Sequence, residues 1–306
     1  MSDGSPIERA DQWVRAQTSG PADLALLGAP IGRASMSASQ AWTTPPAFRA
    51  ALTRFPTWDA DTDTDLTGLR MRDLGDVIGD EADVDATAAH RRIEAAVSAS
   101  LEVAPVLVVV GGDNSLTRPA LLGLSGRRLG DDWGLLTLDA HHDTRPLVDG
   151  VSRNGTPVRE LIEAGLPGTR VAQVGIHGFG NARSTARWAT AAGIHIHPLP
   201  EVRGRGVLPV IKTALAEMRA AGARRIYVDL DVDVVDRAYA PACPASLPGG
   251  LSPSEVAAAA RALGQQPDVV ALDLTEVDAS TDVAAITVRL VGLLFMSFCA
   301  GVARRR

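Results

Sequence analysis

Short apolar runs that alternate with amphipathic stretches constrain the fold of this chain more than any other feature. The apolar runs lie at 23–28, 105–110, 133–138, 170–175, 225–230 and 268–274. Helix-like segments lie at 45–54, 84–102, 158–164, 183–192, 207–221, 253–263 and 283–303. Continuous apolar strands separated by helices are typical of a mostly parallel sheet with helices on both faces. Ligands of such sheets bind beyond the carboxyl ends of the strands, so the residues after each run are the candidates for chemistry.

Acidic residues follow the third of these runs. Asp139, His141 and Asp143 alternate along the chain directly after 133–138, so in an extended segment their side chains point the same way. Two carboxylates and an imidazole at a buried strand end are costly without a compensating cation. A polar loop with a helix cap is the structural alternative.

The run at 225–230 repeats this pattern with three aligned carboxylates, Asp229, Asp231 and Asp233. Such carboxylates repel one another unless they are protonated, paired or bound to metal. Oxygen ligands with few imidazoles favour manganese or magnesium over zinc. A carboxylate shared between two ions would make a two-metal hydrolytic site, in which a metal-activated hydroxide attacks an electrophilic carbon.

Three motifs in order carry a resemblance to a known family. Gly-Gly-Asp-Asn-Ser at 111–115, Asp-Ala-His-His-Asp at 139–143 and Asp-Val-Asp-Val-Val-Asp at 231–236 resemble the motif series of the ureohydrolases, which include arginase, agmatinase and formimidoylglutamase. The resemblance runs from about residue 23 to 300. It implies a three-layer α/β/α fold with an eight-stranded mostly parallel sheet, as one domain over 1–306 whose segment 1–20 is peripheral. It also implies two manganese ions per subunit at the strand ends.

The resemblance also implies a ligand set. The matching positions are Asn114, Asp139, His141, Asp143, Asp231 and Asp233. Asp139 and Asp231 would each bridge the two ions, and Asn114 stands where the family has a histidine. An amide oxygen binds manganese more weakly than an imidazole does, so one ion is expected to bind loosely.

Further departures indicate the substrate. Asn154, followed by Gly155, replaces the histidine that arginases and agmatinases use in proton transfer to the leaving amine, and the stretch resembles that of formimidoylglutamases. Arg145 gives the form D-A-H-x-D-x-R, typical of formimidoylglutamases, and could bind a substrate carboxylate, as could Arg153. Glu276 sits where the family has a glutamate that holds the amidinium group.

We therefore expect hydrolysis of N-formimidoyl-L-glutamate to L-glutamate and formamide, a step of histidine degradation. Asp143, His141 and Glu276 form the expected catalytic set. One alternative is a hydrolase of another guanidino or amidino acid, arginase-like or agmatinase-like. Another is a metal-depleted, non-catalytic relative that binds an amidine or serves as an assembly subunit.

Composition and charge limit the classes of binding partner and the cellular location that we expect for this protein. The chain is 46% hydrophobic and 22% charged with a net charge of −6, which predicts a folded protein with no global attraction to nucleic acid or anionic membrane. Cys243 and Cys299 are expected to be free thiols. The N-terminus lacks the pattern of a signal peptide, and the apolar stretch 290–302 is too short to span a bilayer. We expect a soluble, cytoplasmic protein, and by resemblance a homo-oligomer, either a trimer or a hexamer.

Overall fold

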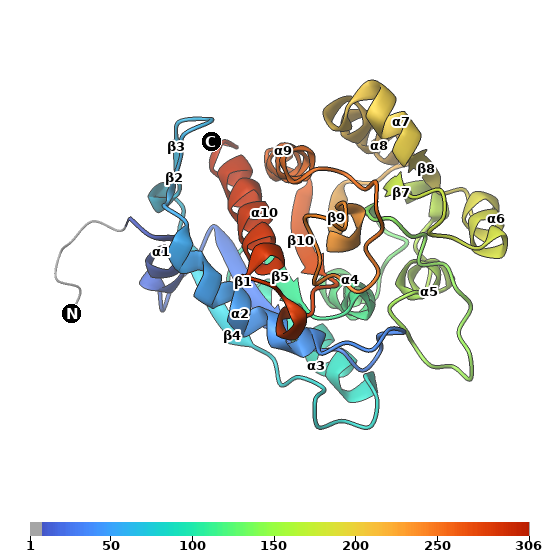
Figure 1. Cartoon of the computed structure of the whole chain (residues 1–306), viewed down its shortest axis with the longest axis horizontal. Helices are drawn as coiled ribbons and strands as arrows, with labels where there is room; N and C mark the ends of the chain where they lie inside the picture. The colour runs from blue at the N-terminus through green and yellow to red at the C-terminus, as the bar shows by residue number, and fades with distance from the viewer. Residues whose placement is uncertain (1–7, 306) are drawn as a thin grey trace.

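Within residues 8–305, which the computed structural model describes, eight strands form one parallel sheet at the centre of the protein (Figure 1). The strands are β1 (Leu24–Ala29), β4 (Met71–Asp76), β5 (Leu107–Gly111), β6 (Trp133–Leu138), β7 (Val171–Ile176), β8 (His195–Pro198), β9 (Arg225–Asp231) and β10 (Val269–Thr275). Their order across the sheet is β4-β1-β5-β10-β9-β6-β7-β8. A separate antiparallel hairpin pairs β2 (Trp58–Asp59) with β3 (Thr64–Asp65).

The central strands are largely apolar because both faces of the sheet are covered. In β1, Leu24 and Leu26 pack into one hydrophobic cluster, while Ala25 and Leu27 pack into the cluster on the opposite face. Alternate side chains of an extended chain point to opposite faces, so a strand covered on both sides needs apolar residues at every position.

Helices form the two outer layers. The helices are α1 (Ala10–Ala16), α2 (Thr44–Ala51), α3 (Thr87–Ser100), α4 (Thr117–Ser125), α5 (Pro157–Glu163), α6 (Arg183–Ala191), α7 (Leu199–Arg205), α8 (Val207–Ala220), α9 (Pro253–Gly264) and α10 (Ile286–Ala303). Buried side chains of α3 to α6 belong to one cluster, and those of α1, α2 and α7 to α10 belong to the other. The predicted three-layer α/β/α fold is thereby confirmed.

The sequence pattern located the central strands but not the edges. The six predicted strands all form, whereas β4 and β8 were not predicted. Both are edge strands whose residues are largely half-exposed, so they lack a continuous apolar run. The helices α1, α4 and α7 were also not predicted. α4 carries Pro119 and Gly123, which obscure a helical pattern, yet Pro119 lies in the first turn, where proline is tolerated.

The apolar C-terminal stretch 290–302 lies within the helix predicted at 283–303, which the structure confirms as α10. α10 has 18 residues and is long and apolar enough to cross a membrane, but 78% of it is buried inside the fold, where it packs against α9. Cys299 of this helix is buried and free, as is Cys243, in agreement with the prediction. At the other end, residues 1–7 of the segment expected to be peripheral lie outside the described residues. α1 lies against the edge strand β4 with Trp13 buried.

Close backbone approach explains the second glycine of the Gly-Gly-Asp-Asn-Ser motif. The Asp113 N–H donates to the Ile31 carbonyl at 3.0 Å, which draws the end of β5 against the segment after β1. A Cβ atom on Gly112 would lie 1.8 Å from that same carbonyl oxygen. The glycine therefore serves packing at the sheet edge rather than phosphate binding.

We predict that Gly112→Ala lowers the free energy of unfolding by about 1–3 kcal/mol, because a rigid backbone carbonyl must move to accept the methyl group. Urea unfolding in EDTA measures this change from the midpoint and slope. Gly68→Ala is the control, because a Cβ at Gly68 meets nothing within 4 Å. Equal stability of the two variants would refute the close-approach explanation.

Candidate active site

The carboxyl ends of four adjacent strands bring the polar motifs together. β5, β10, β9 and β6 are consecutive in the sheet, so the segments that follow them meet at one edge. A cavity of about 80 Å³ opens there. Its lining side chains are Met36, Ser37, His141, Asp143, Arg145, Asn154, Gly155, Asp231, Asp233, Ala245 and Glu276.

Two groups of side chains at this cavity could each hold a metal ion. One consists of Asp139, His141 and Asp233, and in each group the ligand atoms lie within 4.8 Å of one another. The other consists of Asp139, Asp143 and Asp231. Asp139 belongs to both groups, as a bridging carboxylate must, whereas Asp231 belongs to one.

The donor chemistry fits divalent cations. Asp139 is buried, and its Oδ2 has no hydrogen-bond partner within residues 8–305. A buried carboxylate oxygen without a donor is costly unless a cation faces it. Oxygen atoms dominate both groups, with one imidazole, which suits manganese or magnesium.

Hydrogen bonds fix the ligand side chains. His141 Nδ1 lies 2.6 Å from Asp233 Oδ2, and Asp233 Oδ1 accepts the Ala140 N–H at 2.9 Å. Asp231 Oδ1 in turn accepts the Asp233 N–H at 2.8 Å. Asp139 Oδ1 accepts the His141 N–H at 2.5 Å. The carboxylates are therefore oriented by neighbouring backbone before any ligand arrives.

Burial and mutual repulsion govern the charges. Burial raises the pKa of Asp139 and of Asp231 well above the ordinary value, and the charge of Asp233 adds to it in both cases. Burial also raises the pKa of Asp143, to about 7. Burial opposes charge on His141, but the carboxylate of Asp233 outweighs it and raises the imidazole pKa to about 10. Without metal, protons and His141 compensate the carboxylates.

Asn114 presents its amide nitrogen to this cluster. Its Nδ2 donates to Asp143 Oδ2 at 2.7 Å, while its Oδ1 accepts from the hydroxyls of Thr117 and Thr275 at 2.9 and 3.2 Å. A metal-ligand role would require the amide to turn over so that the oxygen faces Asp143. Thr117 permits this turn, because its hydroxyl also lies 2.8 Å from Asp273 Oδ2 and can direct its one proton there while it accepts from the amide nitrogen.

Glu276 connects the metal-ligand groups to the loop expected to bind substrate. Its Oε1 accepts the Asn114 N–H at 2.7 Å and the Asn154 Nδ2 at 2.9 Å. Its backbone φ is 64°, a left-handed conformation that is uncommon for non-glycine residues and costs conformational energy. Burial, together with the charge of Asp113, raises its pKa to about 8. A cationic amidine would relieve this unfavourable burial.

The structure separates the two candidate arginines. Arg145 lines the cavity, and its backbone N–H donates to the Gly155 carbonyl at 3.0 Å. Arg153 is exposed and is not among the lining side chains. Arg145 is thus placed to meet a ligand at the mouth, whereas a role for Arg153 would need the ligand to extend outward.

Sequence reasoning did not identify Met36, Ser37 or Ala245 as lining residues. Met36 and Ser37 follow β1, whose carboxyl end lies at the same edge of the sheet, so the strand-end rule alone points to this segment. Ala245 lies in the loop after the aspartate motif.

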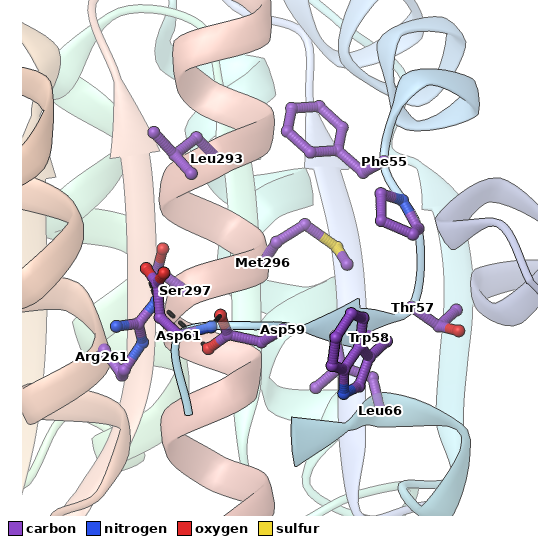
Figure 2. A pocket seen from close by; sticks show the side chains of 11 residues that line it. Phe55, Thr57, Trp58, Asp59, Asp61, Leu66, Arg261, Leu293, Met296 and Ser297 are labelled. Atoms are coloured by element: carbon purple, nitrogen blue, oxygen red, sulfur yellow. Dashed lines mark hydrogen bonds and ion pairs between the residues drawn. The ribbon is translucent and has the colours of Figure 1, made fainter. Parts of the chain in front are cut away.

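A larger cavity of about 150 Å³ lies elsewhere, between the β2–β3 hairpin and α10 (Figure 2). Its walls are mostly apolar, with Phe55, Leu293 and Met296 among them. Its guanidinium, Arg261, is already paired with Asp59 at 3.1 Å. Groups suited to hydrolysis gather at the strand ends instead.

Comparison with known proteins gives a consistent result. Residues 22–301 match the arginase family. Formimidoylglutamases from Halalkalibacterium halodurans and Bacillus subtilis are 34% and 31% identical, over 90% and 95% of this chain and 86% and 89% of theirs. The crystal structure of the Bacillus subtilis protein has a TM-score of 0.89 at 28% identity, covering 99% of this chain and 96% of that one. An asparagine-to-histidine variant of Trypanosoma cruzi formiminoglutamase with Mn²⁺ has a TM-score of 0.88 at 25% identity, covering 97% and 99%.

We predict that Mn²⁺ stabilises the protein more as the pH rises. Asp143 and Glu276, with pKa values of about 7 and about 8 against ordinary values of 3.8 and 4.5, hold protons in the folded state that the unfolded state has lost. Because the folded state binds more protons, metal-free stability falls as the pH rises between about 4 and 8. A cation replaces those protons, so the Mn²⁺-induced rise in Tm should grow across this window.

Thermal unfolding with Mn²⁺ or with EDTA, from about pH 5.5 to 8.5, measures the effect. Asp139→Asn should remove most of the shift. Asp131→Asn, in an exposed position, should leave it unchanged. A shift that does not depend on pH would contradict the expected competition between protons and metal.

Proposed function

The chain belongs to the arginase family, and on that premise we propose that it hydrolyses N-formimidoyl-L-glutamate to L-glutamate and formamide in histidine degradation. The observation that carries the proposal is one cavity that joins the carboxylate cluster to Arg145 at the mouth. The formimidoylglutamases that match nine-tenths or more of this chain support the choice of substrate.

We propose that the two ligand groups would hold two manganese ions, with Asp139, which belongs to both groups, as a ligand common to them. The family resemblance implies the same role for Asp231. Asn114 would complete the ligand set of one ion through its amide oxygen, and it would bind that ion weakly. When bound, such ions lower the pKa of a water and supply the nucleophile at neutral pH.

Residues of the chain would then orient the substrate and transfer the proton. The Glu276 carboxylate pairs with the cationic amidine, so that the amidine carbon faces the nucleophile. The Asn154 amide donates to the Glu276 carboxylate and keeps it in place. Asp143, a member of one ligand group that also lines the cavity, would accept a hydrogen bond from the attacking water and take its proton. The hydroxyl of the water stays on the formimidoyl carbon, the bond from that carbon to the glutamate nitrogen breaks, and the proton on Asp143 passes to the leaving amine.

Charge at the mouth selects the class of amidine. Arg145 can pair with a substrate carboxylate, and Arg153 is a more distant candidate for the same role. Agmatine has no carboxylate and carries only positive charge, so Arg145 would repel it. Asn154 cannot donate an ionisable proton to the leaving amine as the histidine of arginases and agmatinases does. Both features favour an acidic formimidoyl substrate, with hydrolysis of another guanidino or amidino acid as the second candidate.

The proposal includes a homo-oligomer, a trimer or a hexamer, and a cytoplasmic location. A non-catalytic relative with a depleted metal site is the competing class, and the weak ligand at Asn114 is the feature that favours it. Elemental analysis of the purified protein separates these classes, since the enzyme requires bound metal.

We predict that manganese-loaded protein releases glutamate from N-formimidoyl-L-glutamate with a kcat on the order of 1–10³ s⁻¹. Arginine and agmatine, assayed in parallel, should give no product above the EDTA blank. Asp139→Asn is the matched negative control. Silence on all three substrates, in folded protein with metal bound, would contradict the proposed function.

We predict that Arg145→Ala raises the KM for the acidic substrate by roughly 10- to 100-fold, the loss expected for a charge-assisted hydrogen bond. Steady-state kinetics measure it, with manganese content checked in each variant. Arg187→Ala, an exposed arginine on α6, is the control and should leave KM unchanged. An unchanged KM in Arg145→Ala would remove this residue from substrate binding.

A further inference from the structure

A buried carboxylate lies outside the cavity, on the first turn of α5. Glu160 is 7% exposed and is not a lining residue. Its Oε1 accepts the Thr156 hydroxyl at 2.5 Å. Its Oε2 accepts the Ser152 hydroxyl at 2.8 Å and lies 2.9 Å from Arg118 Nε.

The surroundings of Glu160 satisfy its charge and both of its oxygens. A buried ion pair adds little net stability compared with apolar packing, since desolvation offsets the attraction. Removing one partner, however, leaves the remaining donors without an acceptor. The main effect of Glu160 is therefore on the position of the groups bonded to it, rather than on the free energy of unfolding.

The segment held by Glu160 is the loop 152–156. The Thr156 hydroxyl also accepts the Arg153 N–H at 3.0 Å and lies 2.8 Å from the Arg153 carbonyl, which closes a tight turn around Asn154 and Gly155. One carboxylate thus holds both ends of the turn, through Ser152 and Thr156.

The turn contacts residues that line the cavity, among them Glu276 and Arg145. Asn154 donates to Glu276 and accepts the Met36 N–H at 3.0 Å. The Gly155 carbonyl accepts the Arg145 N–H, and a Cβ on Gly155 would lie 2.9 Å from the Arg145 Cδ. Displacement of the turn would therefore shift Glu276 and Arg145 together.

The other end of the clamp is anchored beside the metal-ligand groups. Arg118 lies in the first turn of α4 and follows Thr117, whose hydroxyl contacts Asn114 Oδ1. The pair Arg118–Glu160 therefore links α4 to α5. Through it, the loop 152–156 keeps a fixed position relative to the end of β5.

We propose that Glu160 is a positioning residue for substrate binding: its clamp on the loop 152–156 sets Asn154 against Glu276 and Gly155 against Arg145. The kinetic part of this inference rests on the proposed function. Glu160 does not touch the substrate or the metal ligands, so it acts on KM through the turn and leaves metal affinity unchanged.

Kinetics of Glu160→Ala should show a KM raised about 10- to 100-fold, the loss typical of misplaced binding groups, with a much smaller change in kcat. Glu160→Gln should recover part of the KM, because its amide oxygen can accept from Thr156 and its nitrogen can donate to Ser152, whereas the link to Arg118 is lost. Glu163→Ala is the control, since Glu163 is half-exposed on the same helix and pairs only with Arg159 among the ion pairs of the described residues. Mn²⁺ affinity, by titration, should match wild type in all three.

Hydrogen exchange separates this inference from the proposed function. In Glu160→Ala, amides of 145–156 should exchange at least about tenfold faster, with no change at 225–233. Wild-type KM in Glu160→Ala, or a loss of Mn²⁺ affinity in Glu160→Gln, would overturn the positioning role. If wild-type protein releases no glutamate, the proposed function fails, and the exchange pattern alone decides the role of Glu160.

Discussion

Repulsion among buried carboxylates at the carboxyl edge of the sheet is the constraint around which this structure is built. Asp139, Asp143 and Asp231 lie within reach of one ion, and each has a raised pKa because burial disfavours its charge. His141 is the nearby group whose positive charge their field stabilises. Such an arrangement is stable only where the surrounding packing holds the carboxylates in place and a cation compensates their charge.

The packing that holds it comes from strand order and from polar anchors. β9 lies between β10 and β6, so its aspartates face the ends of both neighbours. Asp113 stays beneath the site, where it accepts the Ala34 N–H at 3.0 Å and the Ser115 hydroxyl at 2.5 Å, and so joins the loop after β1 to that after β5. Without these bonds the carboxylates would separate, which their repulsion favours.

The sequence predicted the parts of the site that follow apolar strands, and it missed those set by tertiary contact. Asp139 and Asp231 were found because alternation after a buried run places side chains on one face. Met36 follows a predicted strand but carries no polar motif, and its N–H bond to Asn154, 118 positions away, is a tertiary contact that no local pattern predicts. The edge strands β4 and β8 were missed for a related reason, since half-exposed strands carry no continuous apolar signal. The assignment of each site residue to its chemical role stays a prediction.

Asn114 and Asn154 act as a pair in this structure. Both place N–H donors on Glu276 Oε1, one from the backbone and the other from the side chain. By the motif resemblance, both stand at positions where arginases and agmatinases carry histidine. Neither amide can carry a proton between substrate and solvent. Among the described residues, the ionisable side chains that line the cavity are His141, Asp143, Arg145, Asp231, Asp233 and Glu276. In the proposed reaction the leaving amine would therefore take its proton from this set, and Asp143, which we propose to accept the proton of the attacking water, is the candidate.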